Sequence, residues 1–330
     1  MELFINISLL SLLLATAIGI VVSRDLLVSV MLTGIYGFLS ASFFVLMDAV
    51  DVAFTEAAVG SGISPLLMLL TLAMVGRYET CQRSYRLPAL ILVLITGGLL
   101  IVGTIDMPAF GTADAPVHQH VAPRYLEASY GEIGIPNVVT SVLASYRAFD
   151  TFGEVVVVFA AGIGVMSLLS IGAQPASGPR DDGARHHTIL RVVSKILIPP
   201  IMLFAFYVQF HGDYGPGGGF QAGVIFAASV ILYTLFFGID LARQVLSENL
   251  LRVLAAMGAL LYGSVGVVSL LSGGNFLDYN VLLADPIAGQ HLGIIVIEAG
   301  VGITVASVMV LIFYSFIGQL SNKDSGDTAQ

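Results

Sequence analysis

Several acidic side chains of this 330-residue chain lie inside long apolar stretches, where an ionisable group is costly to place. Asp51 and Glu56 begin one stretch, and Glu298 lies within another, seven residues after His291. Near a bilayer centre such a side chain costs about 2.5–3.5 kcal/mol on insertion scales, so it needs a partner, a wet cavity or a function. Carboxylates there can pass protons or cations. Glu298 could equally form a hydrogen bond to a neighbouring helix.

A second group combines one basic and two acidic side chains at helical spacing. Arg147, Asp150 and Glu154 stand at i, i+3 and i+7, which on one helix stacks them on a single face. An adjacent guanidinium lowers a carboxyl pKa and apolar burial raises it, so one carboxylate could stay ionised while the other titrates. This arrangement favours a proton or cation stepping site. The alternative is a structural ion pair at the membrane interface.

The stretch FHGDYGPGGGFQAG, residues 210–223, contains a third set of chemical groups. It lacks the Lys-Ser/Thr of a phosphate-binding loop and no strand precedes it, so nucleotide binding is not expected. Its proline and glycines should end one helix and free backbone groups, which a membrane tolerates only where protein or water covers them. A tight outer turn explains the glycines but not the His and Asp. The candidate gating or packing residues are His211, Asp213, Pro216, Gly217, Gly218, Gly219 and Phe220.

The elements that position these groups are predicted to be membrane-spanning helices. The chain is 57% hydrophobic and 11% charged, whereas soluble domains carry about 25% charged residues. Apolar runs of about 17–25 residues, each able to cross roughly 30 Å of hydrocarbon, predict an all-α polytopic membrane protein with about nine transmembrane helices. The runs are about 3–22, 27–47, 53–75, 88–105, 150–172, 193–210, 220–239, 253–272 and 292–317. The segment 135–150 is too short to cross and is predicted to be an interfacial or re-entrant helix.

The basic residues predict the orientation of these spans. With the N-terminus outside, 11 of the 13 Lys and Arg residues fall on one side, and Arg124 and Arg147 on the other. The positive-inside rule assigns the first side to the cytoplasm, so we expect the N-terminus outside and the C-terminus in the cytoplasm. The single cysteine and the pair His118 and His120 do not make a convincing metal site, so no metal and no cofactor are expected.

Three segments resemble one family of membrane proteins. FHGDYGPGGGFQAGVIFA, with IEAGVGITV around Glu298, resembles the B subunit of Mrp-type multisubunit sodium/proton antiporters. Upstream, DVAFTEAAVGSGISPLLML resembles the three-span MbhD-like module, and YRAFDTFGEVVVVFAAGIGV resembles the two-span MbhE-like module. The resemblance therefore implies the C-terminal part of an A-type chain fused to a four-span B-type chain, and its spans sum to the nine found from hydropathy.

Module boundaries follow from the resemblance and from composition. We expect an MbhD-like module at 1–87, an MbhE-like module at 88–172 with an outer loop at 106–134, and an MrpB-like module at 193–318. The Pro-, Gly- and charge-rich segment 173–192 is predicted to be a cytoplasmic linker, and 319–330 a disordered tail.

The resemblance also implies roles for particular residues and partners. It assigns a functional carboxylate to Glu56, a functional pair to Arg147 and Glu154, and the proline and phenylalanine of the glycine motif to Pro216 and Phe220. No large antiporter-like module with membrane lysines is recognised, so we do not expect a complete pump. The implied partners are the antiporter-like A and D type subunits and the C, E, F and G subunits, with Na⁺ and H⁺ as transported ions, in the bacterial inner membrane. No nucleic acid is expected as a partner.

The sequence therefore predicts a transporter subunit rather than an enzyme. We expect it to contribute buried carboxylates to an ion path between partner subunits of an Mrp-type antiporter. One alternative is a membrane-arm subunit of an ion-translocating redox complex of the membrane-bound hydrogenase type. A second alternative is a non-conducting scaffold, and a third, an independent carrier, is disfavoured because no internal repeat is recognisable.

Overall fold

The computed structural model describes residues 2–80, 86–109, 111–170 and 188–327, and these residues are mainly helical. Among them nine helical segments are long and apolar enough to cross a membrane, which confirms the predicted all-α architecture and the number of spans. Most of the predicted linker at 173–192 lies outside the described residues. Its described end, 188–192, is the first turn of a spanning helix.

Six elements make up the N-terminal part of the fold. They are α1 (Glu2–Val22), α2 (Leu26–Leu46), α3 (Val50–Ala58), the π-helical segment η1 (Val59–Ile63), α4 (Ser64–Val75) and α5 (Arg86–Ile105). The third span is α3, η1 and α4 joined end to end, so one π-helical turn widens it in the middle. Sequence periodicity did not predict this turn.

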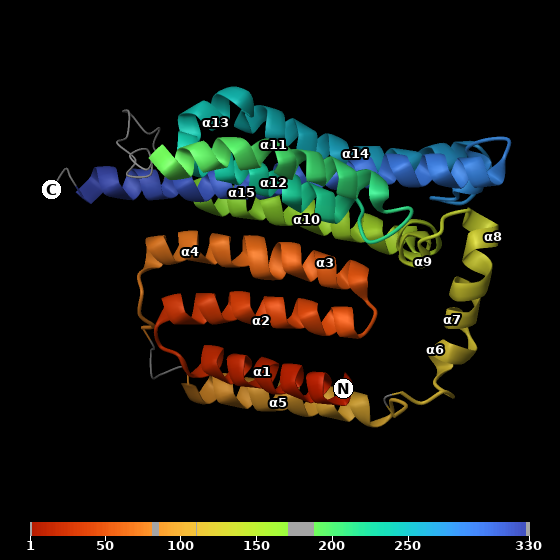
Figure 1. Cartoon of the computed structure of the whole chain (residues 1–330), viewed down its shortest axis with the longest axis horizontal. Coiled ribbons are helices and arrows are strands. Elements are labelled where there is room, and N and C mark those ends of the chain that lie inside the picture. Colours follow the sequence, from red (N-terminus) through yellow and green to blue (C-terminus); the bar gives the residue numbers. More distant parts are fainter. Residues whose placement is uncertain (1, 81–85, 110, 171–187, 328–330) are drawn as a thin grey trace.

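A chain of short helices follows on one side of the molecule. It comprises α6 (Pro116–Gln119), α7 (Val121–Pro123), η3 (Arg124–Ala128), α8 (Ser129–Ile133), α9 (Val138–Ser141) and η4 (Val142–Tyr146). The last two occupy the segment 135–150, where the sequence predicted a short non-spanning helix. Figure 1 shows α6 to α8 running between the two layers described below.

The C-terminal part contains the remaining helices. They are α10 (Ala148–Ser170), α11 (Thr188–His211), α12 (Gly219–Phe237), α13 (Ile239–Val245), α14 (Glu248–Leu271), the 3-10 turn η6 (Tyr279–Val281) and α15 (Pro286–Asp327). Helix α15 continues to Asp327, into the segment from 319 that the sequence predicts to be a disordered tail. Neither proline nor glycine interrupts the polar stretch between Gly318 and Gly326, so the sequence permits this extension.

The helices form two layers. In Figure 1, α10 to α15 form the upper layer and α1 to α4 the lower one. The core lies in the upper layer, where the most apolar stretches of α12 and α15 are 56% and 61% buried, against 0% for α1 and α5. Small residues allow α12 and α15 to pack closely: a Cβ added to Gly219 would overlap the carbonyl oxygen of Glu298. Such contacts between small residues are a common basis for helix packing in membranes.

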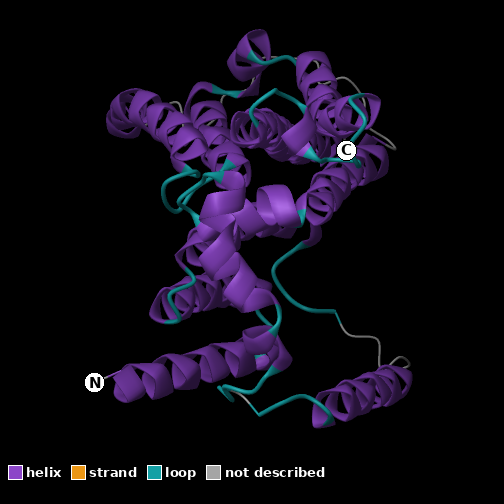
Figure 2. Ribbon diagram, turned by 90° about the vertical axis from the view of Figure 1, so that its right-hand side faces the viewer, coloured by secondary structure: helices purple, strands orange, loops and turns teal. Residues whose placement is uncertain are grey.

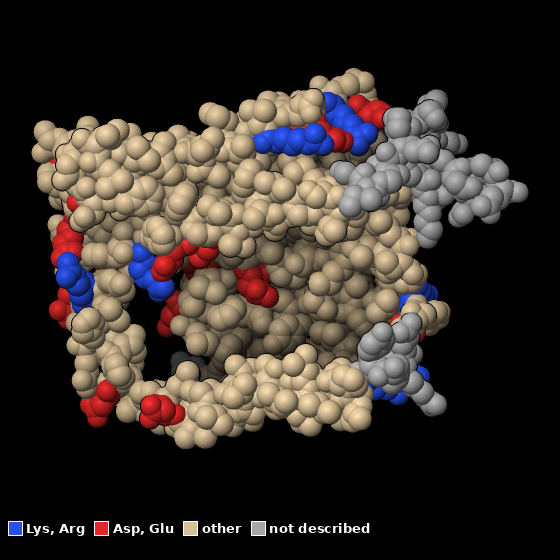
Figure 3. Space-filling model, turned by 180° about the vertical axis from the view of Figure 1, so that it is seen from behind, with Lys and Arg blue, Asp and Glu red and all other residues tan. Residues whose placement is uncertain are grey.

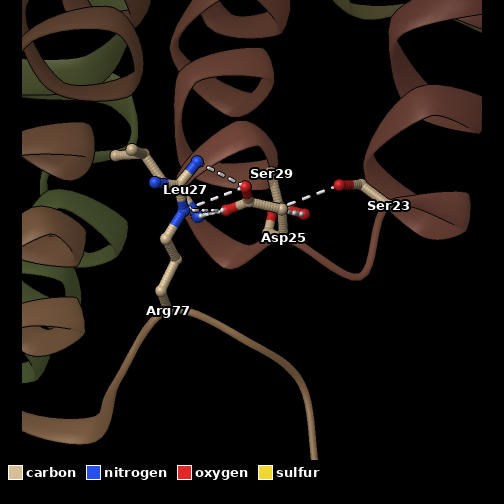
Figure 4. Close-up of polar contacts among 5 residues, drawn as sticks. All are labelled: Ser23, Asp25, Leu27, Ser29 and Arg77. Carbon is tan, nitrogen blue, oxygen red and sulfur yellow. Dashed lines mark hydrogen bonds and ion pairs between the residues drawn. The ribbon is translucent and has the colours of Figure 1, made fainter.

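At one end of the lower layer, an ion pair joins the α1–α2 turn to the segment after α4 (Figure 4). Asp25 caps the N-terminus of α2 by accepting from the Leu27 amide at 3.0 Å, and the Arg77 guanidinium beyond α4 contacts the same carboxylate, with Nη2 and Oδ2 2.7 Å apart. Hydrogen bonding from Arg77 holds the pKa of the Asp25 carboxyl below its usual value. The pair therefore fixes the α1–α2 turn against the end of the third span.

Helix α5 stands apart from the rest of the fold. Although α1 and α5 overlap in Figure 1, Figure 2 shows them on opposite sides of the base of the molecule. No residue of α5 is buried. Seen from behind, the space-filling view shows a hollow between the layers with acidic side chains at its edge (Figure 3).

Candidate functional site

The glycine-rich loop between α11 and α12 has a fixed backbone. Gly218, at the N-cap of α12, has φ +136°, a conformation that favours glycine, and its amide donates to the Val208 carbonyl at 3.1 Å. A Cβ on Gly217 would lie 2.7 Å from the same carbonyl oxygen. The loop therefore folds back on the end of α11, which only residues without a side chain allow.

Residues from both upstream modules hold this loop. The Gly217 amide donates to Asp51 Oδ1 on α3 at 3.1 Å. The side chain of Asn137, which caps α9, donates to the Gly212 and Gly215 carbonyls, both at 3.0 Å, and the Thr140 hydroxyl donates to Gly212 at 2.6 Å. All three predicted modules therefore meet at this loop, and Asn137 and Thr140 are contacts that sequence reasoning missed. Their only sequence signal is a capping residue directly after Pro136.

A cavity of about 190 Å³ lies where the modules meet, and we call it the junction cavity. Three carboxylic acids line it: Asp51 on α3, Glu154 on α10 and Glu298 on α15. No Lys or Arg does so. Gln221 on α12 also lines it and donates to the Thr55 hydroxyl at 2.9 Å. The remaining lining residues are Thr55, Val139, Thr140, Leu143, Ala144, Thr151, Val155, Gly217, Gly218, Gly219, Phe220, Ile297 and Val301.

Glu298 lies close to the start of α12. A Cβ on Gly218 would lie 3.3 Å from Glu298 Oε1, so the glycine leaves room for the carboxylate beside the first turn of that helix. The amides at a helix N-terminus carry partial positive charge, which stabilises a nearby anion. Glycines of the motif thus position Glu298 as well as turning the chain. Phe220 also lines the cavity, whereas the Pro216 side chain is exposed.

Glu56 lies outside the lining of the junction cavity. It is half-buried on α3 and faces Gly60 in the π-helical turn, where a Cβ would overlap its carboxylate. On the other side, a Cβ on Gly37 of α2 would lie 2.7 Å from the Gly60 carbonyl carbon. Helix α2 therefore approaches α3 closely at the π-helical turn beside Glu56.

The structure divides the predicted triplet of charges. Arg147 and Asp150 form an exposed ion pair at 2.6 Å, while Glu154 lines the junction cavity. Arg147 has φ −120° and ψ 30°, outside the helical region, and α10 begins only at the next residue. The prediction that one helix carries all three residues is wrong for this reason.

His211 ends α11 and Asp213 lies in the loop that follows, and neither lines the junction cavity. The His211 ring stacks on Tyr207, with centroids 4.8 Å apart. Asp213 is half-buried, and its backbone carbonyl accepts from the Asn137 amide at 3.1 Å. Burial raises the pKa of the Asp213 carboxyl, and the charge of His291 acts in the opposite direction.

The expectation of buried carboxylates is wrong for this chain by itself. Among the described residues no charged side chain is buried: Glu56 and Glu298 are half-buried and Glu154 is exposed. Glu154 stays exposed on α10 although it lines the junction cavity. Within the same residues no group of three or more His, Cys, Asp or Glu side chains is arranged to hold a metal ion.

Family models match three successive parts of the chain. The MbhD model, which describes the D subunit of MBH, matches residues 11–77, and the MbhE model, which describes the E subunit of MBH, matches 86–178. "Domain related to MnhB subunit of Na+/H+ antiporter" matches residues 189–311. The order agrees with the predicted order of modules.

Similar proteins and solved structures point the same way. The chain is 27% identical over 89% of its length to the A/B-type subunit of a "Probable K(+)/H(+) antiporter" of Rhizobium meliloti, of which it covers 32%. It is 34% identical over 39% of its length to the antiporter subunit mnhB2 of Staphylococcus aureus, of which it covers 94%. In the Mrp complex from Dietzia sp. DQ12-45-1b, one chain matches 93% of this chain with TM-score 0.74 and 27% identity.

A respiratory complex also contains a similar chain. The structure of the membrane-bound sulfane sulfur reductase, an archaeal respiratory membrane complex, has a chain that matches 70% of this one with TM-score 0.51 and 28% identity, and 97% of that chain is covered. By contrast, the present chain spans about a third of the Rhizobium protein and of the Dietzia chain, 32% and 34%. The matched modules, the fold and the near-complete cover of the staphylococcal subunit together show that this chain belongs to the family of membrane subunits of Mrp-type multisubunit antiporters, which are transporter components rather than enzymes.

Proposed function

We propose that the chain forms part of the cation or proton path of an Mrp-type antiporter and that the junction cavity is one stage of this path. The observation that carries the proposal is that carboxylates from three modules line one cavity without a Lys or Arg. A cleft lined by one sign of charge concentrates ions of the opposite sign. Carboxylates in such a cavity can also accept and release protons.

Glu298 and Glu154 are the central groups of the proposed path. Glu298 belongs to the ninth span and Glu154 to the fifth, so the cavity brings together acids from helices far apart in sequence. Glu56, behind Gly60, and the Arg147–Asp150 pair flank this route and are proposed to belong to it. Because Glu154 is exposed on this chain, a partner subunit would complete the wall beside it.

The family also suggests the setting. We infer that the partners are other subunits of the antiporter, namely the antiporter-like A and D type subunits and the C, E, F and G subunits. The location would be a bacterial inner membrane, with the N-terminus outside and the C-terminus in the cytoplasm, as the basic residues predict. The relatives are named for Na⁺/H⁺ and for K⁺/H⁺ exchange, and we propose a monovalent cation exchanged for protons.

Vesicles containing the assembled complex test the proposal. Glu154→Gln, Glu298→Gln and Glu56→Gln remove one titratable group each and keep its shape. We expect the initial rate of cation-dependent ΔpH change to fall by about 100-fold for the Glu154 and Glu298 variants. This is the smallest usual rate loss when a positioned proton-transfer group is removed. Glu127→Gln, at an exposed acid outside the spans, is the matched control. Na⁺, K⁺ and Li⁺ are compared, and a native gel checks assembly.

Full antiport by all three assembled variants would overturn the proposal and leave a non-conducting scaffold.

A second candidate function is a membrane subunit of an ion-translocating redox complex, which the likeness to the sulfane sulfur reductase chain favours. Purifying the native complex separates the two, because a redox complex would carry peripheral subunits with iron–sulfur clusters.

A further inference from the structure

A second hollow lies in the upper layer and shares no residue with the junction cavity. We call it the side groove. It has a volume of about 380 Å³ and runs between α11, α12, α14 and α15. Its lining is almost entirely apolar and includes Phe206, Phe210, Phe226, Leu251, Ile303 and Ala306.

The side groove opens on the outer surface of the chain. Phe206, Phe210 and Ile303 all line it and are 52%, 69% and 37% exposed. All four helices around it are spans, so the surrounding medium is lipid. Small residues, Gly223 and Gly302, line it and bring α12 and α15 close together, since a Cβ on Gly223 would lie 2.7 Å from the Gly302 carbonyl oxygen.

The size of the groove limits what can occupy it. Its volume is in the range of small-molecule sites, roughly 300–1,000 Å³. A partner's spanning helix, about 10 Å across and 30 Å long, is far larger. A single acyl chain combines the required length, narrowness and absence of polar groups.

Two basic residues are close in sequence to residues that line the groove. Leu246, the residue after α13, and Leu251 line the groove. Arg243 lies three residues before Leu246, and Arg252 follows Leu251 directly. Both arginines pair with Glu248, at 2.6 Å and 3.4 Å, which leaves one positive charge uncompensated within this trio. Figure 3 shows Lys and Arg side chains gathered with a few acidic ones at one end of the upper layer.

The Arg243 guanidinium is partly accessible. Its side chain is 37% exposed, so an acceptor from the surrounding medium can reach its terminal N–H groups. A phosphate oxygen is a strong acceptor for a guanidinium. From the apolar groove together with these basic residues, we propose that the side groove binds one acyl chain of an anionic phospholipid whose phosphate lies against Arg243 and Arg252.

Photo-crosslinking of the intact complex tests this. The complex is reconstituted into vesicles with phosphatidylglycerol or phosphatidylcholine that carries a diazirine on one acyl chain. We expect phosphatidylglycerol to label residues of α11 and α15 that line the side groove, and more strongly than phosphatidylcholine does. Arg252→Gln should reduce this preference by about fivefold, the effect of one basic residue near an anionic surface.

Filling the groove supplies the second test. Ala306 is half-buried in the lining, so Ala306→Phe should occupy the space and abolish the label at the groove. Val253→Phe, on the same module at a site 58% exposed and outside the lining, should leave it unchanged. Equal labelling by both lipids, unchanged labelling of an assembled Ala306→Phe complex, or a crosslink from the groove to a partner subunit instead of lipid would each overturn the proposal.

Discussion

Asp213 shows how one residue links the loop to its surroundings. It lies between the sixth and seventh spans, outside both, and burial is the main reason why the pKa of its carboxyl is raised. A carboxyl with a raised folded pKa contributes stability below its unfolded pKa, and this contribution is lost as the pH rises through the folded pKa. Once ionised, Asp213 therefore opposes folding of the loop.

We expect Asp213→Asn to raise the melting temperature of the complex at pH 7, because the amide stays neutral. The gain should shrink as the pH falls toward the usual Asp value of 3.8, where wild-type Asp213 is also protonated. Thermal melts between pH 4 and 8 measure this. Asp240→Asn, at an exposed carboxylate, is the control. A gain that stays constant with pH would contradict the assignment.

At the scale of elements, α12 and α15 pack so closely that their contact leaves little space for larger side chains. It brings together the helix that starts at the glycine motif and the helix that carries Glu298, so its spacing sets the geometry of the junction cavity. A Cβ on Gly223 would lie 2.7 Å from a carbonyl oxygen of α15. Because that oxygen belongs to the backbone, it cannot easily move away from the added atom.

Gly223→Ala should therefore destabilise the complex by about 1–3 kcal/mol, the usual cost of overpacking. Gly164→Ala on α10, where an added Cβ meets nothing within 4 Å, should be neutral or slightly stabilising because alanine favours helix more than glycine does. Denaturation of the two complexes side by side measures the difference. Equal stability would show that α12 and α15 have room to separate.

At the scale of the whole molecule, the direction of insertion remains a prediction from the arginines. The single cysteine, Cys81, lies in a segment predicted to be cytoplasmic. A membrane-impermeant maleimide should label it in inverted vesicles but not in intact cells. Tyr130→Cys in a chain with Cys81→Ser, at an exposed site in the outer segment, should give the reverse pattern. Labelling of Cys81 from outside intact cells would reverse the topology.

The sequence predicted the large elements well and the site incompletely. Hydropathy located all nine spans, because length and apolar content decide whether a helix can cross a bilayer. It could not show that Asp51, Glu154 and Glu298 share one cavity, since this depends on how three modules pack. The π-helical turn beside Glu56 escaped it as well, because one extra residue in a helical turn leaves no compositional trace.

The exposure of helix α5 bears on the turnover of the chain in the cell. None of its residues is buried, and an added Cβ at Gly97, Gly98 or Gly103 would meet nothing within 4 Å. A newly inserted chain thus carries a span in which the rest of the described fold buries no residue. Proteolysis acts on open or loosely held segments, so a span without buried residues makes the unassembled chain a substrate. We therefore expect the steady-state amount of this chain to follow the synthesis of its partners, so that its own turnover sets the ratio of subunits.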